Sequence, residues 1–109
     1  MYSPITLVVF PVKDMDKAKV FYTAFLGVDP NTDSPNYVGY KVGDLEIGLD
    51  HNGQEQVSYT DVADINQSLS ELVAAGAEVH SEAKNVGGGL LIAQVKDADG
   101  NILGLRQQG

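Results

Sequence analysis

The sequence predicts an α+β fold made of two tandem βαβββ modules. Two extended apolar runs, residues 5–10 and 57–60, each lead through a Val-x-Asp motif into a segment whose apolar residues recur with the spacing of a helix face. After each segment the apolar residues alternate, which is typical of strands. Because this pattern occurs twice in 109 residues, we expect a single domain with a first module over about residues 1–53 and a second over about residues 57–109.

Each first strand is followed by a predicted helix. Asp14 and Asp64 stand where an N-cap would accept hydrogen bonds from the first turn, and Gln67 follows Asp64 at the spacing of a capping box. Gly27 and Gly76 suit the left-handed position after a helix. The apolar faces are Met15, Ala18, Phe21, Tyr22 and Phe25 in the first helix, and Ile65, Leu69, Leu72 and Val73 in the second.

Two hairpins complete the modules. Residues 37–42 and 45–49 flank Gly43-Asp44, and residues 90–95 and 102–105 flank a turn rich in Asp, Gly and Asn. Residues 29–36 predict a surface loop, and residues 52–56 predict the junction between modules. Tyr37 and Tyr40 should fall on opposite faces of their strand, so at most one can offer a stacking surface to a planar ligand.

Composition excludes several classes of function. The chain has no cysteine, which removes disulfides, thiolate nucleophiles and thiolate metal sites and fits a reducing compartment. Its net charge of −8 repels phosphate backbones and anionic lipids, so neither nucleic acid nor membrane is an expected partner. The first apolar run is too short to span a bilayer and lacks the basic region of a signal peptide. We therefore expect a soluble, cytoplasmic protein.

Three stretches together resemble the vicinal oxygen chelate superfamily, which includes glyoxalase I, extradiol dioxygenases, fosfomycin-resistance transferases and bleomycin-binding proteins. They are Val12-x-Asp14-x-x-Lys17-Ala18-x-x-Phe21-Tyr22 with Leu26-Gly27, then Leu72-x-x-x-Gly76-Ala77-Glu78-Val79, and finally Asp97-x-Asp99-Gly100-Asn101 leading into Gly104-Leu105. The resemblance spans essentially the whole chain and is specific for the fold, although such a fold hosts many chemistries. It implies two modules that form a curved mixed sheet around a shared cavity, usually in a homodimer.

The resemblance also implies the position of a metal site. In metal-dependent members, a His or Glu from each of four strands holds a divalent ion that chelates two neighbouring oxygens of the substrate. The matching positions here are Leu7, Gly48, Val57 and Gly104. A divalent ion needs several imidazole or carboxylate donors, and these residues supply none. We therefore expect neither a metal nor another cofactor at this location.

Side chains alternate between the two faces of a strand. Residues that lie an even number of positions from one of these four, along the same strand, should therefore face the cavity as well. The candidate ligand-binding residues are Leu7, Val9, Glu46, Gly48, Asp50, Val57, Tyr59, Gly104 and Arg106, with Asp61 on the same face. Gly48 and Gly104 would leave room where a metal and its ligands stand in other members. Alternatively, each glycine marks a bulge or close backbone packing.

Other residues that carry chemistry have plainer interpretations. His51 lies beside Asp50, but neighbouring strand residues point to opposite faces, so an exposed loop position is expected in place of an acid–base pair. His80 is expected at the surface. The glycines at 87–89 lack the lysine and the helix of a phosphate loop and predict a turn or a flexible flap. No catalytic nucleophile can be assigned.

Three hypotheses of function follow. The first is a non-metal binding protein, similar to the bleomycin- and mitomycin-binding branch, that holds a small organic molecule of aromatic or cationic character and forms a homodimer. The second is a lyase, isomerase or dioxygenase with an atypical site, in which Glu46 or Asp50 is a general base and Arg106 stabilises an oxyanion. The third is a scaffold or regulatory domain whose cavity is filled by its own side chains.

Overall fold

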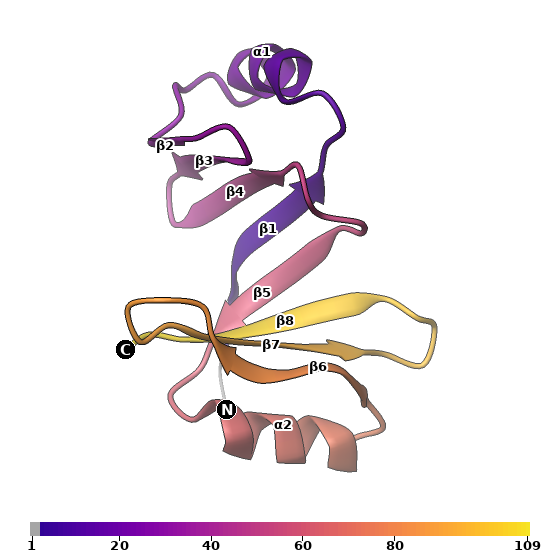
Figure 1. The fold of residues 1–109 in the computed structure, drawn as a ribbon. Helices are drawn as coiled ribbons and strands as arrows, with labels where there is room; N and C mark the ends of the chain where they lie inside the picture. The colour runs from indigo at the N-terminus through magenta and orange to yellow at the C-terminus, as the bar shows by residue number, and fades with distance from the viewer. Residues whose placement is uncertain (1–2) are drawn as a thin grey trace. The chain divides into compact units, whose positions relative to one another are not determined.

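The computed structural model describes residues 3–109 and contains two βαβββ modules in tandem (Figure 1). The first module consists of β1 (Ile5–Pro11), α1 (Met15–Leu26), β2 (Thr32–Asp33), β3 (Tyr37–Val42) and β4 (Leu45–Asp50). The second consists of β5 (Val57–Asp61), α2 (Ile65–Ala74), β6 (Glu78–Asn85), β7 (Leu91–Lys96) and β8 (Ile102–Gln107). This order confirms the α+β fold that the repeated pattern predicts.

The chain divides into two compact units. One unit is Thr6–Val57, and the other is Ser58–Gly109 together with residues 3–5. The start of the chain is tied to the second unit because the Thr60 hydroxyl donates a hydrogen bond of 2.8 Å to the carbonyl oxygen of Pro4. Among residues 3–109, no helix is long and apolar enough to cross a membrane.

In the first unit the strands lie in the order β2-β3-β4-β1. β4 pairs antiparallel with β3 and parallel with β1, and the short β2 pairs with β3, so the predicted loop at residues 29–36 contains a strand. The core beneath α1 is Val38, Tyr40, Ile47 and Leu49. Tyr40 is 1% exposed and its hydroxyl is held by Thr23 Oγ1 and the carbonyl of Lys19, which confirms that Tyr37 and Tyr40 face opposite ways.

The second unit repeats this arrangement with the order β5-β8-β7-β6. β5 runs parallel to β8, and β7 pairs antiparallel with both β8 and β6. α2 covers one face of the sheet, and the core beneath it is Ile65, Leu69, Ala93, Val95 and Leu105. Every second side chain of these strands therefore points toward the helix. The side chains between them form the opposite face of the sheet.

The helix ends follow the expected chemistry with two differences. Asp14 and Asp64 each accept a hydrogen bond of 3.1 Å from the backbone N–H three residues on, as predicted for N-caps. The capping box is not completed, since the Gln67 side chain donates to Glu71 instead. Gly27, with φ +74°, is the C-cap residue of α1, whereas the C-cap residue of α2 is Ala75 and not the predicted Gly76.

α1 is less buried than its sequence pattern predicts. Phe21 and Phe25 belong to the predicted apolar face, yet they are 59% and 73% exposed. The ring of Phe21 stacks on that of Phe25, with centroids 5.9 Å apart. Met15, Ala18 and Tyr22 do pack against the core, so the inward face of α1 is narrower than expected.

Candidate functional site

The candidate residues of the first module lie on the sheet face opposite α1. In the parallel pairing of β1 with β4, Leu7 stands opposite Glu46 and Val9 stands opposite Gly48. Asp50 follows at the same parity at the end of β4. Ile47 and Leu49, which alternate with them, point into the core beneath α1. The alternation of side chains along β1 and β4 therefore predicted correctly that these residues share one face of the sheet.

The second module repeats this geometry. Tyr59 stands opposite Gly104 and Asp61 opposite Arg106 in the parallel pairing of β5 with β8. Val57 precedes Tyr59 at the same parity and is buried. This face lies opposite α2, because Leu105 of the alternate parity belongs to the core beneath the helix.

Tyrosine rings cover both glycines that occupy metal-ligand positions. A Cβ added at Gly48 would collide with the phenol end of Tyr37, and a Cβ added at Gly104 would fall within the ring of Tyr59. The expectation that these glycines leave open room is therefore wrong. The glycines are needed because an aromatic ring packs directly on the backbone, which is the alternative that the sequence left open.

Hydrogen bonds fix the polar groups on the second face. Gln94 Nε2 donates to Tyr59 Oη at 2.9 Å, from the position on β7 that pairs with Gly104. Arg106 Nε donates to Asp61 Oδ1 at 3.0 Å and Arg106 Nη2 to Asp61 Oδ2 at 3.4 Å. Arg106 is 9% exposed, so its guanidinium is a buried charge that is paired with a carboxylate.

Sequence reasoning left open which of Tyr37 and Tyr40 lies on the candidate face of the first module, and it missed Gln94. Tyr37 lies on β3, where its parity places it beside Gly39, the partner of Gly48. Tyr37 lies three residues from Tyr40 on the same strand, so burial of Tyr40 beneath α1 places Tyr37 on the opposite face. For Gln94 the signal was a polar residue between Ala93 and Val95, which are both buried in the core.

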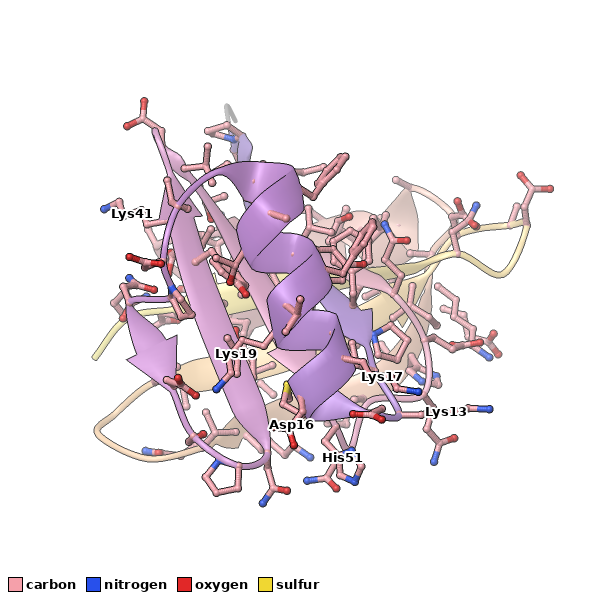
Figure 2. The ribbon with its side chains drawn as sticks, turned by 90° about the horizontal axis from the view of Figure 1, so that it is seen from above. Lys13, Asp16, Lys17, Lys19, Lys41 and His51 are labelled. Carbon is pink, nitrogen blue, oxygen red and sulfur yellow. The ribbon has the colours of Figure 1, made fainter. Side chains whose placement is uncertain are left out.

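Asp50 holds a turn, and both histidines lie at the surface. Asp50 Oδ1 accepts a hydrogen bond of 2.9 Å from the backbone N–H of Asn52 and so caps the turn after β4. His51 and His80 are both exposed, as predicted. Figure 2 shows His51 near the start of α1, where it lines a polar hollow with Lys13 and Asp16. The glycines at 87–89 form a turn capped by Asn85.

The metal that the resemblance implies does not fit these residues. Leu7 and Val57 carry hydrocarbon side chains, and Gly48 and Gly104 carry no side chain and lie under tyrosine rings. Within residues 3–109, no three His, Asp or Glu side chains gather in a way that could hold an ion. The polar and aromatic groups that these faces carry are the carboxylates of Glu46 and Asp50, the Arg106–Asp61 pair, and the Tyr37 and Tyr59 rings with Gln94.

Comparisons with known proteins identify relatives of this fold. Residues 5–105 match the sequence model of the Glyoxalase/Bleomycin resistance protein/Dioxygenase superfamily, whereas no curated protein sequence matches the chain. A hypothetical protein from Bacillus halodurans matches with a TM-score of 0.79 at 14% identity, over 100% of this chain and 96% of that one. An NAD-dependent benzaldehyde dehydrogenase from Legionella pneumophila matches with a TM-score of 0.78 at 18% identity, over 94% and 98%.

A third solved structure carries the same superfamily name. It is a glyoxalase/bleomycin resistance protein/dioxygenase superfamily member from Vibrio splendidus, with a TM-score of 0.71 at 16% identity over 97% of this chain and 98% of that one. At such identities the similarity establishes a shared fold, and the two βαβββ modules are the part that is shared.

Proposed function

Because the chain belongs to the glyoxalase/bleomycin resistance protein/dioxygenase superfamily, we propose that it is a non-enzymatic binding protein for a small organic molecule. The molecule carries an aromatic ring, is neutral or cationic, and contacts the sheet face of the second module that bears Tyr59. The observation that carries this proposal is the replacement of metal donors by aromatic rings at Gly48 and Gly104. Such a face favours ring contacts over coordination of oxygen atoms.

Tyr59 is 7% exposed, so a ligand would meet its hydroxyl group and the exposed edge of its ring rather than a full ring face. Its hydroxyl oxygen accepts the hydrogen bond from Gln94, and the hydroxyl proton is then available to a ligand oxygen. Gln94 also fixes the orientation of the phenol. A ligand with a ring and a carbonyl or hydroxyl group would match this pair of contacts.

Charge favours cations over anions as ligands. Glu46 and Asp50 lie on the first-module face, and the whole chain has a net charge of −8. A phosphorylated ligand, a nucleic acid or an anionic membrane would be repelled by this field. We extend the proposal to a cytoplasmic homodimer that has neither nucleic acid nor membrane as a partner.

The proposal is tested by thermal unfolding with a panel of aromatic and cationic antibiotics. A true ligand at 100 times its dissociation constant should stabilise the protein by about 2.7 kcal/mol. Tyr59→Phe retains the ring and removes only the hydroxyl, so it should weaken affinity for that ligand about fivefold to tenfold. Tyr22→Phe, on the helix side of the first sheet, is the matched control and should leave affinity unchanged.

Two results would overturn the binding proposal. One is a flat response across the panel. The other is purified protein that contains stoichiometric nickel, zinc, iron or manganese, together with an activity that a chelator removes. That second result would favour the lyase, isomerase or dioxygenase hypothesis, in which ligands other than the four superfamily positions hold the ion.

A further inference from the structure

The helix side of the second module contains an apolar cavity of about 430 Å³. It lies on the opposite side of the sheet from the Tyr59 ring, between β5, β8 and the C-terminal end of α2. Hydrocarbon groups of Leu72, Ala77, Val95 and Leu105 line it, with the hydroxyl-bearing Ser58 and Thr60. Leu103, at its edge, is 41% exposed, so the cavity opens to solvent.

In the first module, aromatic side chains occupy the corresponding place. There the ring of Tyr22 from α1 stacks on the ring of Phe10 from β1, with centroids 5.5 Å apart, and both pack against the core. Alignment of Val12-x-Asp14 with Val62-x-Asp64 places Thr60 at the position of Phe10 and Leu72 at that of Tyr22. The second module therefore lacks the stacked aromatic pair.

At three further positions, the second module has a smaller side chain than the first. The strand registers place Val95 at the position of Tyr40, which is fully buried beneath α1. Ser58 stands at the position of Val8, and Gly76 at that of Leu26. The exposed fractions of two corresponding residues agree with this looser packing. Ile47 is 7% exposed, whereas its counterpart Leu103 is 41% exposed. The cavity is thus the space that aromatic side chains fill in the first module.

We propose that this cavity binds a small neutral aromatic molecule, such as a phenol with a short alkyl substituent. The missing side chains define the size and shape of the ligand, and the volume falls within the range of small-molecule pockets. The apolar lining disfavours water and would make an ionised group costly to bury. This site does not depend on the proposed function, because it uses other residues on the other face of the sheet.

The polar groups of the cavity select a ligand hydroxyl. Thr60 Oγ1 donates its proton to Pro4, so its oxygen remains an acceptor, while Ser58 can donate or accept. Lys96 and Asp97, the charged residues in the lining, have opposite signs. The Asp97 carboxylate accepts hydrogen bonds from Asp99 and Asn101 within its own turn, which hold both of its oxygens in place there.

Titration of ¹⁵N-labelled protein with phenol and 4-methylphenol, followed by NMR, tests this site. Saturable shifts are expected at the amides of Ser58, Thr60, Leu72 and Leu103. Thr60→Phe restores the residue that the first module uses and fills the cavity, so it should weaken binding by about tenfold or more. Thr60→Val loses the same hydroxyl but keeps the space, so binding of 4-methylphenol should persist.

Circular dichroism checks that each variant is folded, and Leu72→Phe provides a second way to fill the cavity if Thr60→Phe does not fold. The proposal is overturned if these amides show no saturable shift, or if both filled variants bind as the unchanged protein does. Shifts confined to the Tyr59 face would overturn it while supporting the proposed function. Shifts that follow protein concentration without any phenol would overturn it in favour of a second copy of the chain.

Discussion

Gly48 and Gly104 differ in which part of the covering tyrosine an added methyl group would meet. Tyr59 is 7% exposed, is bonded to Gln94, and meets Gly104 with the part of the ring nearest its own backbone. Tyr37 meets Gly48 with its hydroxyl end, the part of the side chain farthest from its own backbone, where a small shift of the phenol makes room for a methyl group. The same substitution should therefore have unequal effects at the two glycines, although they occupy corresponding positions.

We expect Gly104→Ala to lower the free energy of unfolding by about 1–3 kcal/mol, because the added methyl displaces a buried ring. Gly48→Ala should cost less. Urea denaturation measures both values. In a double-mutant cycle, Tyr59→Ser should remove most of the cost of Gly104→Ala, since it removes the ring that the methyl meets. Equal losses at the two glycines would contradict this account of the packing.

For individual residues, the sequence predicted which side chains lie on the same face of a strand but not which residues they contact. Parity alone placed Leu7, Glu46 and Tyr59 correctly, because side-chain alternation depends only on the strand. The contacts of Tyr37 and Gln94 depend on register and rotamer across neighbouring strands, which local sequence does not determine.

Among the secondary-structure elements, the turn between β7 and β8 is fixed by one carboxylate. Asp97 accepts bonds of 2.9 Å from the backbone N–H groups of Asp99 and Asn101 and from the Asn101 side chain. These bonds, led by that of the Asn101 side chain, hold the pKa of Asp97 below its ordinary value of 3.8. The ionised form is thus favoured in the folded hairpin.

A depressed pKa gives a defined pH dependence. The contribution of Asp97 to stability is fully present above pH 3.8 and is lost as the pH falls through the lower folded value. Asp97→Asn should therefore be less stable than the unchanged protein at pH 6, and the gap should narrow below pH 3.8. Denaturation curves of both proteins at matched pH measure the gap. A gap that is independent of pH would show that the charge is unimportant.

Element boundaries were predictable where a single side chain sets them, as at the N-caps Asp14 and Asp64. The short β2 was missed because Thr32 and Asp33 lie in a stretch whose composition is that of a loop. Its pairing with β3 comprises only Thr32 with Gly39 and Asp33 with Val38, which is too short for an alternating apolar pattern to mark the strand in the sequence.

The two modules share one order of helices and strands but differ in how their cores are packed. Periodicity predicted the repeated βαβββ order because it depends on which positions are apolar, not on how large they are. The cavity of the second module escaped prediction because it results from smaller side chains at several positions that meet only in the folded unit, among them Thr60, Leu72 and Val95. Volume is a property of the assembled core.

The exposed aromatic pair on α1 bears on the proposed homodimer. Phe21 and Phe25 stack on each other and are largely exposed, and Val20 of the same helix is 74% exposed. An apolar patch of this kind is typical of an interface, and a two-fold contact would bury the same rings from both copies. We therefore place the dimer contact at this patch, with a second copy of the chain as its occupant.

Sedimentation equilibrium should give a mass about twice that of the 11.6 kDa chain. Phe21→Glu combined with Phe25→Glu puts like charges opposite each other across the two-fold contact and should yield a monomer. Val42→Glu changes an exposed apolar residue on β3 and serves as the control, which should remain a dimer. A dimer that survives the double substitution would place the interface elsewhere, and a monomeric unchanged protein would leave the aromatic pair without this partner.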